Sequence, residues 1–165
     1  MSSRERDRPD MPEGYGVEQA DRFVPWEDID RRLRDSHHYW IATTRAGGRP
    51  HVVPRWGVWL DGALWYDGSP ETVHVRNLDR DPRCALHLED GQEAVIMEGR
   101  SVASDPIEGD LGASLAAEYA RKYGSDYSPA PDAWSDEIAG GMRTLRPEKV
   151  LAWTEFPKDL TRYRF

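Results

Sequence analysis

The feature that most constrains the fold is a series of turn signals inside a long aromatic and β-branched stretch, residues 39–99. Asp61-Gly62 lies between two apolar runs, and Asp90-Gly91 lies between two others. Asp-Gly in this position strongly favours a tight β-hairpin, because both central residues of the preferred turn need a positive φ. The stretch therefore predicts two hairpins of one antiparallel sheet.

Segments rich in apolar and β-branched residues predict six strands, over 39–45, 50–60, 63–68, 83–89, 94–104 and 149–154. Helical spacing of apolar residues, or a helix-start pattern, predicts three helices, over 25–35, 70–80 and 105–124. A serine cap at Ser69 followed by Pro70, and a capping box over 105–108, are expected to begin the second and third helices. Residues 125–147 are predicted to form a long surface loop. We expect a mainly β protein with peripheral helices, built on a six-stranded antiparallel barrel.

Length and composition indicate one domain. The chain has 165 residues, close to the usual size of a single domain. Residues 1–22 are polar and are predicted to form a flexible N-terminal arm, with the folded domain over 23–165. The formal net charge of −8 argues against a nucleic-acid-binding surface.

Cysteine content and hydropathy indicate the compartment. Cys84 is the only cysteine, which excludes an intramolecular disulfide and favours a reducing environment. No run approaches the roughly 20 apolar residues of a membrane span. We expect a cytoplasmic protein without a membrane partner.

The usual catalytic and cofactor motifs are absent from the sequence. It has no Gly-x-Gly-x-x-Gly after a strand, no phosphate-binding Gly-Lys-Ser/Thr loop and no serine in a nucleophile elbow. The five histidines do not have metal-ligand spacing, so no metal site is expected. Cys84 lies within a predicted strand and is expected to be a small buried group rather than a nucleophile. No catalytic residue can be assigned from these patterns.

One cluster of polar residues suggests an anion site. The predicted helix over 70–80 follows a strand, and the N-terminus of a helix offers free amide donors to a phosphate. The basic and polar candidates near this helix start, or on the preceding strand, are Arg49, Arg55, Thr72, His74 and Arg76. From spacing alone, a solvated helix face with a serine cap is the favoured explanation of the same residues.

The order of three motifs resembles the pyridoxamine 5′-phosphate oxidase-like split β-barrel superfamily, and most nearly its flavin/deazaflavin oxidoreductases. The motifs are the run 48–54 (GRPHVVP), the Asp61-Gly62 hairpin and the run 76–83 (RNLDRDPR). Glu98-Gly99, the run 119–124 and the terminal run 161–165 extend the match. The resemblance covers most of residues 25–165.

The resemblance implies a homodimer that binds a flat cofactor, coenzyme F420 or FMN, at the subunit interface. Val53 and Pro54 would lie near its ring, and the helix after the third strand would receive its phosphate. The remaining site residues that the resemblance implies are Arg49, Arg55, Thr72, His74, Arg76, Asn77, Arg162 and Arg164. The alternative for the last two is a terminal strand in which both arginines face water.

The chain departs from the family pattern at the expected phosphate cluster. Relatives commonly carry a basic cluster just before Arg-Asn-Leu, whereas this chain has Thr72, Val73 and His74, with Arg76 kept. If His74 acts as an imidazolium, binding should weaken as pH rises through its pKa. The departure is compatible with a weakened phosphate grip, with a cofactor held elsewhere, or with a different ligand.

The resemblance implies an oxidoreductase that transfers a hydride between coenzyme F420, or FMN, and a small conjugated substrate. In such proteins the cofactor supplies the chemistry, which agrees with the absence of a catalytic motif. The alternative is a non-catalytic split-barrel module that binds a flavin, a haem or another flat aromatic ligand.

Overall fold

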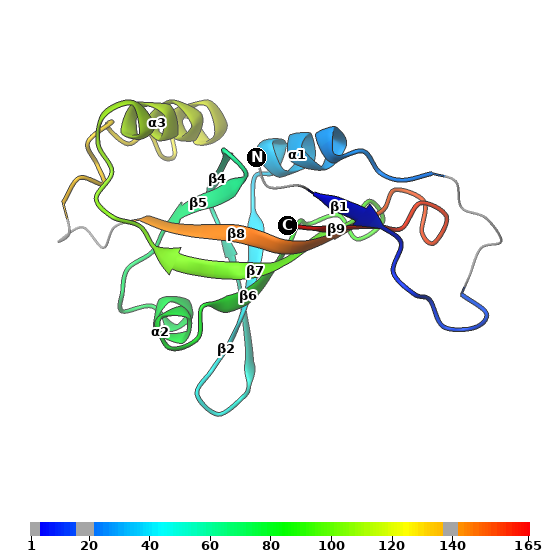
Figure 1. Ribbon diagram of the computed structural model, residues 1–165. Helices are drawn as coiled ribbons and strands as arrows, with labels where there is room; N and C mark the ends of the chain where they lie inside the picture. Colours follow the sequence, from blue (N-terminus) through cyan, green and yellow to red (C-terminus); the bar gives the residue numbers. More distant parts are fainter. Residues whose placement is uncertain (1–3, 16–21, 137–141) are drawn as a thin grey trace.

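The computed structural model describes residues 4–15, 22–136 and 142–165, and its strands form one antiparallel sheet (Figure 1). The nine strands of this described part are β1 (Glu5–Asp7), β2 (Tyr39–Thr44), β3 (Pro50–Arg55), β4 (Val58–Leu60), β5 (Ala63–Asp67), β6 (Arg83–His87), β7 (Val95–Ala103), β8 (Met142–Ala152) and β9 (Thr161–Arg164). The helices are α1 (Trp26–Asp35), α2 (Val73–Arg80) and α3 (Gly109–Tyr123).

The sheet has the order β1-β9-β8-β7-β6-β2-β3, and β5 joins β4 to β8. Every pairing is antiparallel, and the path from β1 to β3 does not close on itself. The predicted mainly β, antiparallel class is confirmed. Three more strands form than were predicted, because one predicted strand divides in two and each end of the chain adds one.

Both predicted hairpins form, but only the first has the expected tight turn. Asp61 and Gly62 have φ values of 51° and 72°, as that turn requires. At the second, the carboxylate of Asp90 accepts hydrogen bonds from the amides of Gln92 and Glu93, at 2.8 and 3.1 Å. This side-chain turn widens the connection between β6 and β7.

The predicted strand over 50–60 is interrupted at Trp56-Gly57. A Cβ on Gly57 would lie 2.8 Å from both the carbonyl oxygen of Trp65 and a methyl group of Leu64. The backbone of Gly57 is held by side chains instead of a neighbouring strand, since its amide donates to the hydroxyl of Tyr123 at 2.8 Å. The chain therefore changes direction here and begins β4.

The predicted caps of α2 and α3 are wrong. Before α2, the amide of Thr72 donates to the carbonyl of Ser69 at 3.0 Å, so the Ser-Pro segment forms a separate turn and the helix begins at Val73. Before α3, Ile107 is buried and its amide donates to the carbonyl of Trp134. That tertiary contact keeps 105–108 out of the helix, which begins at Gly109.

The predicted loop over 125–147 ends earlier than expected, because β8 begins at Met142. Residues 142–145 of β8 pair with β5 on one side, and residues 143–152 pair with β7 on the other. The β7–β8 register shifts between Glu98 and Gly99, which pair with Lys149 and Pro147, so that Glu148 is the extra residue. A bulge accommodates Pro147, which has no amide proton to donate to the ladder.

A short strand lies within the predicted N-terminal arm. Glu5–Asp7 forms β1 and pairs with β9 at the edge of the sheet. The carboxylate of Asp7 accepts hydrogen bonds from Arg162 at 2.6 and 2.7 Å and from Arg164 at 2.8 Å. These ion pairs hold the strand in place. Residues 1–3 and 16–21 of the predicted arm lie outside the described residues.

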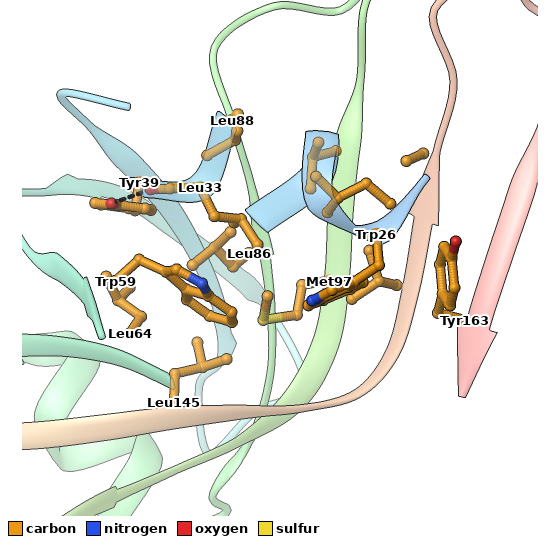
Figure 2. Close-up of a cluster of buried hydrophobic side chains, with 14 of the residues drawn as sticks. Trp26, Leu33, Tyr39, Trp59, Leu64, Leu86, Leu88, Met97, Leu145 and Tyr163 are labelled. Atoms are coloured by element: carbon orange, nitrogen blue, oxygen red, sulfur yellow. Dashed lines mark hydrogen bonds between the residues drawn. The ribbon is translucent and has the colours of Figure 1, made fainter. Parts of the chain in front are cut away.

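The apolar core has two parts. In the larger one, Trp26 and Leu33 of α1 pack among Leu86, Met97 and Leu145 of the sheet (Figure 2). In the smaller one, apolar side chains of α3 pack with residues of β4, β5 and the loop before β8: Val58, Trp65, Leu115, Tyr119, Tyr123 and Trp134. Fully burying one such side chain contributes roughly 1.5–3 kcal/mol. The second part fixes α3 next to the break between β3 and β4.

No helix of the described residues is long and apolar enough to span a membrane.

Candidate functional site

A hollow of about 310 Å³ lies where β3 ends near α3. Its walls come from the end of β3, the end of β5, α3 and the following loop: Pro54, Arg55, Trp56, Asp67, Tyr119 and Tyr127. Two of the predicted site residues, Pro54 and Arg55, therefore line one hollow. Four aromatic or charged residues of its wall were not predicted.

Arg55 is held inside this hollow by Asp67. Its Nη2 donates to the backbone carbonyl of Asp67 at 2.7 Å and lies 3.6 Å from the carboxylate. The Nε of Arg55 is buried and has no hydrogen-bond partner within the described part of the chain. A buried donor without a partner costs about 1–3 kcal/mol, so the site is suited to a ligand that supplies an acceptor.

Two tyrosines complete the polar side of the hollow. The hydroxyl of Tyr127 donates to the Asp67 carboxylate at 2.8 Å, and that of Tyr119 donates to the carbonyl of Trp65 at 3.3 Å. The pKa of each phenol is raised above its ordinary value, and burial is the largest cause. Both side chains are therefore neutral hydrogen-bond donors near neutral pH.

Trp56 forms a flat, fixed wall. Its ring stacks on Tyr123 with centroids 4.7 Å apart and an interplanar angle of 15°. Its indole nitrogen donates to Nε2 of His38 at 3.2 Å. Because both contacts orient the ring, Trp56 offers a preorganised surface to a planar ligand.

His74 is buried, which disfavours the charged imidazole in the chain without a ligand. Its pKa is lowered to about 4, first by burial and then by Arg55, His51 and Arg143. Its Nε2 has no hydrogen-bond partner among the described residues. A Cβ on Gly68 would lie 3.1 Å from this nitrogen, so the turn before α2 packs closely over the ring. Anion binding by an imidazolium at this position stays a prediction.

The other predicted residues of α2 have different surroundings. The buried amide of Asn77 donates to the hydroxyl of Thr43 at 3.0 Å and ties α2 to β2. The hydroxyl of Thr72 donates to the carbonyl of Ser69 at 2.8 Å. Arg76 is exposed on the helix surface. Only Arg76 of these three presents its side chain to solvent without such a bond in the described structure.

The predicted residues of the β2–β3 hairpin do not share one surface. Arg49 is exposed in the turn. Val53 and Pro54 are consecutive in β3, so they point to opposite faces of the sheet. Of the residues of β3, Pro54 and Arg55 line the hollow.

Arg162 and Arg164 belong to β9 and bind Asp7. Four strands lie between β9 and β3 in the sheet order, and Figure 1 shows β9 well away from α2. The tail is a terminal strand in which Tyr163 is buried. The ring of Phe165 packs on the ring of Trp26, with ring centroids 5.1 Å apart. Cofactor contact by these arginines stays a prediction.

A lysine next to the hollow was missed by sequence reasoning. The ammonium of Lys122 donates to the hydroxyl of Tyr39 at 2.6 Å and to the carbonyl of Gly57 at 2.9 Å. Burial lowers its pKa to about 7. The bond from Lys122 to Gly57 holds the backbone just after β3, next to Trp56. No sequence pattern relates a lysine on α3 to a turn 65 residues earlier.

The described residues contain no cluster of three or more potential metal ligands. Burial raises the pKa of Cys84 to about 12, so its thiol is not a nucleophile near neutral pH. The hollow thus holds one fixed cation paired with the Asp67 carboxylate, neutral phenols and a flat ring. This set can bind and orient a planar anionic molecule, and it contains no obvious group for covalent catalysis.

Comparison with known proteins identifies the family. A family model described as pyridoxamine 5′-phosphate oxidase matches residues 25–154. No curated protein sequence gives a match.

Several solved structures share the fold. A conserved hypothetical protein, Rv2991, from Mycobacterium tuberculosis is 22% identical, with a TM-score of 0.63 over 87% of this chain and 92% of that one. A heme binding protein from Mycobacterium smegmatis is 20% identical, with a TM-score of 0.57 over 81% and 56%. An F420 reductase is 21% identical, with a TM-score of 0.55 over 85% and 98%. At these identities the likeness shows the fold alone.

Proposed function

This chain belongs to the pyridoxamine 5′-phosphate oxidase family, and on that premise we propose that it binds a flat, anionic redox cofactor of the flavin or deazaflavin class. The cofactor is coenzyme F420 or FMN. The proposed activity is hydride transfer between it and a small conjugated substrate. A similar fold in an F420 reductase supports the deazaflavin.

The observation that carries the proposal is the state of Arg55. Its guanidinium is fixed by Asp67, half buried, and has one buried donor without a partner. A phosphate or carboxylate oxygen at Nε would form a charge-assisted hydrogen bond. The aromatic wall made by Trp56 lies in the same hollow and suits a planar ring.

The residues fit such a ligand with a reduced set of charges. Arg55 supplies the buried cation, while Arg49 and Arg76 are exposed and His74 is neutral. The Asp67 carboxylate would repel an anion. Its ion pair with Arg55 and its hydrogen bond from Tyr127 reduce this repulsion. Free amides at the start of α2 add a partial positive charge. We therefore expect weaker phosphate binding than a full basic cluster would give.

A bound flavin or deazaflavin would supply the hydride chemistry itself. The chain's own residues would bind the anionic part, support the ring and exclude water. Tyr127 and Tyr119 would donate hydrogen bonds as neutral phenols, because their raised pKa keeps them protonated. Neither is suited to act as a base.

We also propose that the chain forms a homodimer through the outer face of the sheet. Paired positions place a row of side chains on this face across five strands: Pro54, Trp40, His87, Ile96 and Leu151. The neighbouring row begins with Val52, which is 47% exposed, and continues with Ala42 and Ala85. An apolar face of this extent is typical of a protein–protein interface. A second copy would cover Pro54 at the mouth of the hollow.

The second candidate is a carrier module that binds a flavin, a haem or another flat aromatic ligand without turnover. The observation that favours it is the similar fold of a heme binding protein.

The visible absorption spectrum of the purified protein separates these functions. FMN, coenzyme F420 and haem are then titrated into the cofactor-free protein. Saturable binding of FMN or coenzyme F420, followed by reduction or oxidation of the bound cofactor by a substrate, supports the oxidoreductase. Saturable binding of haem alone supports the carrier. Binding of none of the three contradicts both proposals.

Sedimentation at micromolar concentration tests the homodimer, and a monomer contradicts it.

A further inference from the structure

The ring of Trp56, which forms the flat wall of the hollow at Arg55, is held at its edge by His38. The indole nitrogen of Trp56 donates to Nε2 of His38 at 3.2 Å. An indole N–H can only donate, so Nε2 must be unprotonated to accept it. In the imidazolium both ring nitrogens carry protons. The bond therefore forms only when His38 is neutral, with its proton on Nδ1.

Glu89 faces the other nitrogen of the same ring. One of its carboxylate oxygens lies 3.4 Å from Nδ1 of His38. An opposite charge at this distance stabilises the imidazolium. His38 therefore has two neighbours with opposite requirements, since the indole of Trp56 needs the neutral ring and the carboxylate of Glu89 favours the charged one.

The remaining contacts of Trp56 fix the plane of its ring but not the direction of its edge. The ring stacks on Tyr123, and the next residue, Gly57, is held through its carbonyl by Lys122 and Tyr123. A half-turn about the Cβ–Cγ bond would leave the indole in the same plane and place its nitrogen on the opposite edge. The hydrogen bond to His38 is the contact that selects one edge.

We infer that His38 is a positioning residue whose proton state sets the orientation of Trp56 and, through it, the affinity of the hollow for a planar ligand. The last step rests on the proposed function, because it needs a ligand in the hollow. Neutral His38 fixes the ring, and the imidazolium releases it, so binding weakens at low pH. An imidazolium at His74 would have the opposite effect on an anion. Neither His38 nor Trp56 belongs to the two rows of the proposed dimer face.

Other titratable groups surround His38, and the test has to hold them constant. The ring of His37 lies 4.9 Å from that of His38, between centroids, and Glu89 faces it from the β6–β7 connection. On α3, burial lowers the pKa of Lys122 to about 7. His38→Gln keeps all three groups. Its amide oxygen can accept from the indole and does not titrate, which makes it the variant with a permanent bond.

The orientation of Trp56 is tested first, in the cofactor-free full chain. NMR follows the indole N–H signal of Trp56, assigned by its loss in Trp56→Phe, between about pH 8 and 5, where histidines titrate. In the wild type the signal should leave its hydrogen-bonded position as the pH falls, and in His38→Gln it should move much less. In His38→Leu it should lack that position at every pH. His51→Leu is the matched control, because the ring of His51 lies beside Arg45, at 3.3 Å. A signal that is the same in the wild type and His38→Leu overturns the inference.

The effect on the ligand is tested with the dissociation constants of FMN and coenzyme F420. The ratio of the values for the wild type and His38→Gln removes the titration of the ligand and of His74, which both proteins share. We expect a ratio near one at about pH 8 and a wild type that binds about three-fold more weakly at about pH 5.5. A ratio that does not change with pH overturns the inference. If neither protein binds either cofactor, the proposed function fails, and the indole signal still decides whether His38 orients Trp56.

Discussion

The side-chain amide of Asn77 in α2 donates a hydrogen bond to the hydroxyl of Thr43 in β2 across 3.0 Å, and both residues are buried. This bond fixes α2 on the sheet. Because α2 carries His74, whose pKa is lowered in part by Arg55, the bond also positions His74 relative to the proposed anion site.

Thr43→Val should lower the free energy of unfolding by about 1–3 kcal/mol, since it leaves the Asn77 amide buried without its acceptor. Urea unfolding measures the change. Thr44→Val is the matched control, because Thr44 is exposed in the same strand, and it should change stability by no more than about 0.5 kcal/mol. Equal effects of the two substitutions would contradict the role of the bond.

His74 should make the fold sensitive to acid. Its pKa is about 4 in the folded chain and near 6.5 in the unfolded chain, so the unfolded state binds the proton more readily. The contribution of the neutral imidazole to the free energy of unfolding is fully present above pH 6.5. It decreases as the pH falls toward 4, by at most about 3 kcal/mol. His74→Leu should flatten this part of the curve of unfolding free energy against pH. His87→Leu, at an exposed histidine, should keep it; curves that stay parallel for all three proteins would show that His74 is not responsible.

Gly99→Ala should destabilise the protein severely. A Cβ there would lie 2.0 Å from the carbonyl oxygen of Arg146, inside the bulge between β7 and β8. We expect a loss above about 3 kcal/mol in thermal or urea unfolding, or failure to fold. Gly91→Ala has no atom within 4 Å of its new Cβ and should be nearly neutral. A stable Gly99→Ala variant would mean that the bulge has another geometry.

Asp7→Asn should release β1 from the sheet edge. The substitution removes both ion pairs to Arg162 and Arg164, and these hold a strand of only three residues. Hydrogen exchange of residues 4–8 should become about ten-fold faster. Glu13→Gln, at an exposed residue of the same segment, should not change it. Unchanged exchange in Asp7→Asn would show that backbone pairing alone holds β1.

The sequence predicts the interior of the sheet well because periodicity and turn chemistry act locally there. Asp61-Gly62 forms the expected turn, and α1 forms within the predicted range and buries Trp26, Ile29 and Leu33. One strand, β1, and the first part of another, β8, escape this reasoning. The residues of β1 are all charged, and β8 begins in a segment with Arg146 and Pro147. Both strands depend on partners distant in the sequence.

The candidate site is less predictable for the same reason. Arg55 could be expected from its strand, but Asp67 and Tyr127 join it only through the tertiary fold. The charge of His74 depends on burial under the turn at Gly68 and on nearby arginines. No local pattern encodes these contacts.

The central claim is that the hollow at Arg55 binds a flat anionic cofactor, and the affinity of an Arg55 variant tests it most directly. The dissociation constants of FMN and coenzyme F420 are measured for the wild type, Arg55→Gln and Arg146→Gln. Arg146 is exposed on β8 and serves as the matched control. We predict that one cofactor binds saturably, that Arg55→Gln weakens it about ten-fold or more, and that Arg146→Gln leaves it unchanged. Equal affinity of the wild type and Arg55→Gln, or no binding of either cofactor to the wild type, would contradict the claim.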